Sequence, residues 1–134
     1  MSDNAQQTRA GRMTRNRASA KAAGAAAERA VADYLAQALN DDRIDRRVKH
    51  GSEDRGDIGG LRIHGQRLVV EVKNCARTDL AGWIAEAQIE SGNDDALAGL
   101  VISKRKGTTK VGRWYVHMTV DELIALITGQ KADL

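Results

Sequence analysis

The chain has 134 residues, of which 42% are hydrophobic, a composition that suits one folded domain with a modest core. Its formal net charge of +3 allows a polyanionic partner but does not require one. The single cysteine excludes an internal disulfide, and its spacing to the three histidines does not fit a zinc site. No apolar run approaches the roughly 20 residues that a membrane span needs, so we expect a soluble, cytoplasmic protein without a membrane partner.

The N-terminal segment, residues 1–18, is polar and carries four arginines against one acid, with no periodic apolar face. We predict a disordered basic arm there, which either follows DNA phosphates or has no task. Residues 19–134 are then expected to form a single domain. Its first element is an alanine-rich helix over 22–39, because apolar side chains recur at every fourth position and form one stripe.

The middle of the chain contains two strand-like runs, 57–63 and 67–73, joined by a short link with a glycine, which predicts a β-hairpin. The remaining expected elements are a strand at 44–49, a helix from Thr78 or Asp79 to about Ser91, strands at 100–103 and 113–118, and a last helix that a capping box at 119–122 opens and Gly129 ends. The order α-β-β-β-α-β-β-α predicts an α/β fold with a mixed central sheet flanked by helices.

The second run of the hairpin carries charges on an otherwise apolar strand. Side chains alternate between faces, so Glu71 and Lys73 project to one face. With the turn centred near Gly65 and Gln66, Asp57 is expected across from Lys73 or Asn74, close to Glu71. Charges are seldom buried unpaired, which predicts a site at this end of the sheet. The alternative is an ion pair on a half-exposed sheet.

Two carboxylates a few ångströms apart repel each other, and a bound divalent cation removes that repulsion. Oxygen ligands favour Mg²⁺, for which Mn²⁺ is a common substitute. Such an ion polarises a phosphoryl oxygen and lowers the pKa of a bound water, while Lys73 could orient that water or stabilise charge on the phosphate. Glu28, on the striped face of the first helix, either joins this site or reaches solvent at the edge of the stripe.

Other candidates are less persuasive in the sequence. Asp54 could replace the predicted aspartate ligand, but it lies further back in the loop. On the second helix, we expect one or both of Glu86 and Glu90 to face water. Ser103 lacks a plausible base, and His117 is expected at the surface or in a turn.

Basic residues gather in two groups beside these elements. They are Arg46, Arg47 and Lys49 before the hairpin, and Lys104, Arg105, Lys106 and Lys110 around a later turn. Such charges bind backbone phosphates without reading sequence, although a solvated loop is the alternative. Aromatic residues make up only 3% of the chain, which disfavours stacking on unpaired bases, so duplex or branched DNA is the expected partner.

These residues resemble the signature of the PD-(D/E)xK nuclease superfamily, with Gly56-Asp57-Ile58 followed by Val70-Glu71-Val72-Lys73. The α-β-β-β-α-β order over about residues 20–105 is also similar to its restriction-endonuclease-like core, and the last strand and C-terminal helix would be additions. The proline that names the motif is missing here, as it often is in the superfamily. The resemblance implies that Asp57, Glu71 and the backbone carbonyl of Val72 bind Mg²⁺ and that Lys73 assists the attacking water.

The resemblance also implies a substrate class. Phage and archaeal-type Holliday junction resolvases carry a glutamate on the first helix, which would map to Glu28, so a phage-encoded protein fits. We therefore expect residues 19–134 to be a nuclease domain, a structure-selective DNA endonuclease that acts on branched DNA in recombination and repair. Cutting a junction symmetrically needs two active sites, so a homodimer is expected.

Two alternatives stay open. The first is a RecB-like exonuclease or a restriction-type endonuclease. Gln88 would match the glutamine of RecB-like nucleases, but the tyrosine that accompanies it is not at the expected place. The second is a DNA-binding module without catalytic activity, in which the carboxylates are structural.

Overall fold

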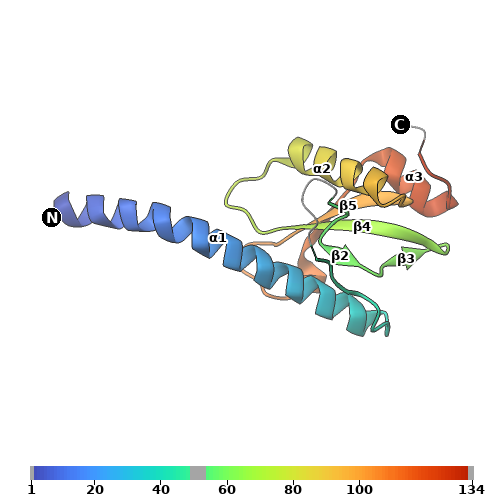
Figure 1. Cartoon of the computed structure of the whole chain (residues 1–134), viewed down its shortest axis with the longest axis horizontal. Helices are drawn as coiled ribbons and strands as arrows, with labels where there is room; N and C mark the ends of the chain where they lie inside the picture. The colour runs from blue at the N-terminus through green and yellow to red at the C-terminus, as the bar shows by residue number, and fades with distance from the viewer. Residues whose placement is uncertain (1, 49–53, 133–134) are drawn as a thin grey trace.

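A computed structural model describes residues 2–48 and 54–132, and the side chains of residues 17–48 and 54–132. Within these ranges six strands form one sheet and three α-helices flank it. The strand order is β1-β2-β4-β5-β6, and β3 pairs with β4. Figure 1 shows α1 along one side of the sheet and α2 on the other. The predicted α/β fold with a mixed sheet is confirmed, because β4 and β5 are parallel whereas the other pairs are antiparallel.

Helix α1 (Ser2–Ala38) is longer than expected and runs through residues 2–18, where the sequence predicted a disordered arm. The chain has no proline, and alanine, which is abundant here, has the highest helix propensity. The C-terminal half of α1 packs on the sheet through Ala27, Val31 and Ala32, which are buried. The N-terminal part extends beyond the sheet (Figure 1).

The predicted hairpin is present, with β3 (Arg62–Ile63) antiparallel to β4 (Gln66–Lys73). His64 and Gly65 form its two-residue turn, and both have positive φ angles, 52° and 72°. Two-residue turns of this kind match the twist of the strands that they join. The hairpin therefore depends on local turn geometry.

The expected first run of the hairpin is divided into β2 (Ile58–Gly59) and β3 by Gly60. Gly60 has a φ of 84°, and a Cβ atom there would lie 2.2 Å from the carbonyl oxygen of Arg43. Only glycine fits this backbone position without a shift of the neighbouring chain. The break at Gly60 changes the pairing of everything that precedes it.

The register between β2 and β4 consequently differs from the expected one. Ile58 faces Val70, and the backbone N–H of Asp57 donates to the carbonyl oxygen of Val70 at 2.9 Å. The prediction that Asp57 lies across from Lys73 or Asn74 is therefore wrong. Asp57 lies nearer the middle of β4.

The other strands extend the sheet on both sides. Helix α2 (Leu80–Asn93) connects β4 to the parallel strand β5 (Ala98–Ser103). The edge strands are β6 (Tyr115–His117), antiparallel to β5, and β1 (Asp45–Arg46), antiparallel to β2. Both are shorter than the strands predicted at 113–118 and 44–49. A one-turn 3-10 helix, η2 (Val111–Arg113), precedes β6.

The two faces of the sheet are covered by different helices. Against α1 pack Ile58, Val70, Val72 and Ile102, and against α2 pack Trp83, Ala87 and Val101. These side chains exclude water from the middle of the sheet. Glu71 and Lys73 of β4 lie on the same face of the sheet as the smaller cluster under α2. They therefore lie at the edge of a region from which water is excluded.

Helix α3 (Val120–Thr128) begins with the predicted capping box, in which Thr119 and Glu122 bond reciprocally, and it ends at Gly129 in the left-handed conformation. Ala125 packs into the core on one side. The other side exposes large apolar side chains, namely Val120, Leu123, Ile124 and Ile127. In the described part of the chain, no helix combines the length and apolar character that crossing a bilayer requires.

Candidate metal centre

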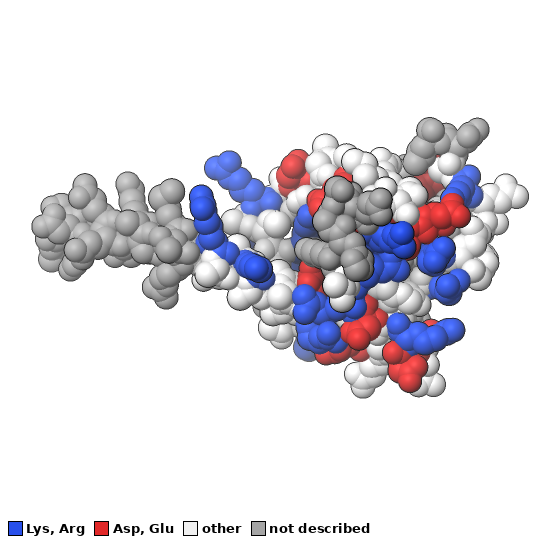
Figure 2. Space-filling view, in the orientation of Figure 1, with Lys and Arg blue, Asp and Glu red and all other residues white. Residues whose placement is uncertain are grey.

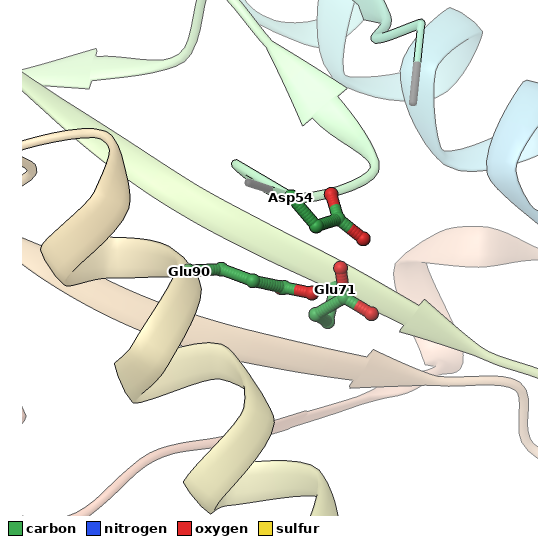
Figure 3. A group of neighbouring side chains, drawn as sticks. All are labelled: Asp54, Glu71 and Glu90. Atoms are coloured by element: carbon green, nitrogen blue, oxygen red, sulfur yellow. The ribbon is translucent and has the colours of Figure 1, made fainter. Parts of the chain in front are cut away.

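Three carboxyl groups from different elements converge beside the centre of the sheet (Figure 3). Glu71 comes from β4, Glu90 from α2, and Asp54 from the loop before β2. One oxygen of each lies within 4.8 Å of the others. Glu71 and Glu90 are each only 3% exposed, so this acidic group lies largely out of water.

The group is electrostatically costly without a cation. One oxygen of Glu71 and one of Glu90 are buried without a hydrogen-bond partner among the described residues. Burial, together with the hydrogen bond and the charge of Glu90, raises the pKa of Glu71 to about 9. Burial also raises the pKa of Glu90 to about 7, helped by the charges of Asp54 and Glu86, although the hydrogen bond with Glu71 lowers it. Near neutral pH, Glu71 therefore holds a proton unless a cation replaces it.

The donor set fits a hard divalent cation. All candidate ligand atoms are carboxylate oxygens, which suit Mg²⁺ better than softer metals. A cation among them would satisfy the two unpartnered oxygens and cancel the repulsion between Glu71 and Glu90. The residues present therefore fit the Mg²⁺ ion expected from the sequence, with Asp54 and Glu90 as additional candidate ligands.

Asp57 is anchored beside this group. It is buried, and its Oδ2 accepts a hydrogen bond from the backbone N–H of Val72 at 2.8 Å. Gly56 precedes it with a φ of 95°, where a Cβ atom would lie 2.9 Å from a methyl group of Val69. This close approach of the loop to β4 holds the Asp57 carboxylate against the strand.

A cavity of about 810 Å³ opens where β4 ends, beside α1. The four residues predicted as catalytic, Glu28, Asp57, Glu71 and Lys73, all line it, as does Val72. They come from α1, the loop before β2, and β4. The structure therefore brings together residues that are up to 45 positions apart in the chain.

Lys73 confirms the predicted same-face pair. Its Nζ lies 3.6 Å from Oε2 of Glu71 and 2.8 Å from Oε2 of Glu86. Burial alone would lower the pKa of Lys73, but the hydrogen bond with Glu86 and the charges of Glu71 and Glu86 outweigh it and raise the pKa. Lys73 is therefore a cation at the cavity wall.

The basic residues before the hairpin are engaged in ion pairs. Arg46 on β1 contacts Oε2 of Glu28 at 2.7 Å, so that Glu28 is buried in a salt bridge. Arg47 contacts Asp94 at 3.1 Å. Both arginines line the cavity. Lys49, the third residue of this predicted DNA-binding group, lies outside the described residues.

The second basic group lies on the loop after β5. Lys104, Arg105 and Lys106 line a neighbouring pocket, whereas Lys110 directly precedes η2 and does not line it. Figure 2 shows Lys and Arg side chains over the middle of one face, with acidic side chains between them.

Two further residues differ from the sequence expectations. The expectation that Ser103 lacks a neighbouring base is wrong, because its Oγ lies 2.7 Å from Nε2 of His117. Gln88 is not brought to the acidic group. Its amide contacts Glu122 of α3 at 3.5 Å, and it lines a separate pocket of about 150 Å³.

Glu90 is the main residue that sequence reasoning did not select. Of the two glutamates on α2, Glu86 is exposed, in line with the expectation, but Glu90 is buried. Trp83, Ala87 and Glu90 are the buried residues of α2, and their spacing of four and three places them on one helix face. That spacing was the available signal.

No family model, curated protein or solved structure matches this chain.

Proposed function

We propose that this protein is a Mg²⁺-dependent DNA endonuclease of the PD-(D/E)xK type. The observation that carries the proposal is a single cavity lined by Glu28, Asp57, Glu71 and Lys73. Beside it, one buried carboxyl oxygen of Glu71 and one of Glu90 have no hydrogen-bond partner among the described residues. Carboxylates with basic residues beside them suit a cation that in turn holds a phosphate.

Each residue of the cavity has a separate role in the proposed reaction. Glu71 and Asp57 would hold Mg²⁺ with the Val72 carbonyl, or Glu71 would share it with Asp54 and Glu90. A bound Mg²⁺ would polarise a phosphoryl oxygen and lower the pKa of a water ligand.

Lys73 is a cation beside Glu71, so it stabilises negative charge that develops on the phosphate and orients the attacking water. Glu28 holds Arg46 at the cavity wall through their 2.7 Å contact. The Arg46 guanidinium is therefore placed to bind a neighbouring phosphate of the same strand.

Branched DNA, and a Holliday junction in particular, is the proposed substrate. Glu28 on α1 lines the cavity, which supports the resolvase type over the other nuclease types. Gln88 lies apart from the cavity, which disfavours the RecB-like exonuclease. The exposed apolar side of α3 offers a surface for the homodimer that symmetric cutting needs.

A cleavage assay tests this function. We expect the chain to cut a synthetic four-way junction in Mg²⁺ but not in EDTA, and to cut it faster than linear or nicked duplex. Asp57→Asn and Glu71→Gln should abolish cutting, and Asp42→Asn, which neutralises an exposed carboxylate in the turn after α1 that does not line the cavity, is the control. Cutting that persists in EDTA, or in both active-site variants, would rule out the metal-dependent mechanism. DNA binding with no cutting in any condition would favour the binding module.

Calorimetric titration with Ca²⁺ identifies the ligands. If Asp57 is the partner of Glu71, Asp57→Asn weakens binding and Glu90→Gln has little effect. If the buried group of Asp54, Glu71 and Glu90 holds the ion, Asp54→Asn and Glu90→Gln weaken it most.

A further inference from the structure

A second pocket, of about 380 Å³, adjoins the cavity that Glu28, Asp57, Glu71 and Lys73 line, which we call the metal cavity. Lys73, Cys75 and Ala76 line both of them, so the two form one continuous depression at the end of β4. The far wall of the second pocket comes from the ends of β5 and β6 and from the basic loop after β5. A polymer bound at the metal cavity would therefore pass over this pocket.

Aromatic rings form one wall of the pocket. Tyr115 on β6 is 52% exposed, and its ring centroid lies 6.4 Å from that of His117. His117 in turn lies 6.2 Å from Trp83 on α2. The chain has only two tryptophans and two tyrosines, and two of these four line this pocket. An exposed ring beside a cavity is a surface on which a nucleobase stacks.

The wall is held rigidly. Ser103 on β5 is buried, and its Oγ lies 2.7 Å from Nε2 of His117. This contact fixes the orientation of the imidazole, which packs edge-on against Tyr115. Because His117 is held in place before binding, it also restricts Tyr115 beside it. Less entropy is therefore lost when a base stacks on Tyr115.

The pocket is basic, whereas the metal cavity has mixed charge. Lys73, Lys104, Arg105 and Lys106 line the pocket, and none of the described residues that line it is acidic. The metal cavity, by contrast, is lined by four carboxylates together with five basic residues. The pocket therefore suits an anion, and lysine and arginine side chains at this density bind phosphate oxygens.

We propose that this pocket binds an unpaired nucleotide of the DNA strand, next to the phosphate that is cut. The base stacks on Tyr115, and the phosphate on its other side contacts Lys104, Arg105 and Lys106. This inference rests on the proposed nuclease function, whose substrate passes through the adjoining cavity. It also revises the sequence expectation that scarce aromatics disfavour unpaired bases, because the few aromatics present are gathered here.

Binding measurements on the full chain in EDTA test the pocket without cutting. Two fluorescein-labelled DNA probes are compared by anisotropy, a fully paired duplex and the same duplex with a short single-stranded overhang. Tyr115→Ala should weaken binding of the overhang probe by about fivefold or more, and leave the paired duplex unchanged. Tyr115→Phe keeps the ring and should restore the affinity.

Val116→Ala is the matched control, because Val116 is the next residue on β6 and is equally exposed, but its side chain lies on the opposite face of the strand. A 2-aminopurine base in the overhang should be quenched by the wild-type chain and by Tyr115→Phe, but not by Tyr115→Ala. Equal losses on both probes, or no loss on either, would overturn the pocket's proposed role.

The outcomes separate this inference from the nuclease function. If the chain cuts junctions in Mg²⁺ while Tyr115→Ala shows no selective loss, the nucleotide pocket is wrong and the nuclease stands. If no cutting occurs but the selective loss appears in EDTA, the nuclease is wrong and the pocket stands.

Discussion

Glu71 on β4 and Glu90 on α2 hold their carboxyl groups together in the interior, and within the described part of the chain one oxygen of each has no hydrogen-bond partner. Buried like charges destabilise a fold unless a proton or a cation lies between them. The pair therefore links the stability of the protein to pH and to divalent cations.

Without metal, the stability should decrease as the pH rises. The pKa of Glu71 is about 9 in the folded chain against an ordinary value of 4.5. Between these values Glu71 holds a proton in the folded chain that it has released in the unfolded chain. The stability that this proton contributes is fully present below the unfolded pKa and is lost as the pH rises towards the folded pKa. Urea unfolding in EDTA from about pH 5 to pH 9 should show this decline, and Glu71→Gln should flatten it. A free energy of unfolding that rises over this interval would contradict the assignment.

Glu90→Gln should stabilise the metal-free chain and weaken its metal binding. At pH 8 the amide removes the buried negative charge of Glu90 and keeps a polar group beside the protonated Glu71, so we expect a gain of about 1 kcal/mol in the free energy of unfolding. If Asp54, Glu71 and Glu90 hold the ion, loss of the Glu90 carboxylate should also weaken Ca²⁺ binding by roughly tenfold or more. Thermal unfolding with and without Ca²⁺ measures both effects. A variant that is destabilised in EDTA would show that burial of the Glu90 charge costs less than its hydrogen bond with Glu71 contributes.

Lys73→Met should separate catalysis from metal binding. Removing the cation that faces the phosphate should lower the single-turnover cutting rate by roughly 100-fold or more. Ca²⁺ affinity should hold or increase, because the positive charge 3.6 Å from Glu71 is gone. Lys73→Arg, which keeps the charge, should retain part of the rate. A parallel loss of metal affinity and rate would instead make Lys73 a structural residue of the centre.

Gly60→Ala should destabilise the fold more than Gly65→Ala. A Cβ atom at Gly60 would lie 2.2 Å from the carbonyl oxygen of Arg43, whereas nothing lies within 4 Å of one at Gly65. Both positions have positive φ, so each alanine costs about 1 kcal/mol in backbone strain, and the clash at Gly60 should add about 2 kcal/mol. Urea unfolding of the two variants gives the difference. Equal losses would show that the chain around Arg43 can move aside.

The exposed side of α3 should mediate dimer formation. Ile127→Glu places a charge on it and should convert a dimer to a monomer in light scattering coupled to size exclusion. Ile89→Glu is the matched control, because Ile89 is a similarly exposed isoleucine on α2. A wild-type chain that is monomeric at all concentrations, or an equal effect of both substitutions, would exclude this surface as the interface.

The sequence predicted best those features that neighbouring residues determine. The capping box of Thr119 and Glu122 and the tight hairpin link that contains Gly65 need only a few consecutive residues, and both are present, although the turn lies one residue earlier than predicted. The position of Glu71 and Lys73 on one face followed from strand alternation alone.

Features that depend on contacts between distant residues were harder to predict from the sequence. The register of Asp57 was wrong for two reasons. The turn lies at His64 and Gly65, one residue earlier than predicted, and Gly60 interrupts the first run. The need for glycine at position 60 comes from the distant backbone of Arg43. The burial of Glu90 depends on how α2 is rotated against the sheet. Its helical spacing from Trp83 indicated the face, but not that the face would meet a second glutamate.

Lys73 lines both the metal cavity and the basic pocket. Its ammonium lies 3.6 Å from Glu71. Under the proposed function, the metal ion and the bound nucleotide would therefore share one electrostatic neighbour. Binding equilibria that share a component are reciprocal: whatever factor a cation contributes to the affinity for a nucleotide, the nucleotide returns to the affinity for the cation. A single side chain would thereby couple binding of the cofactor to binding of the DNA strand.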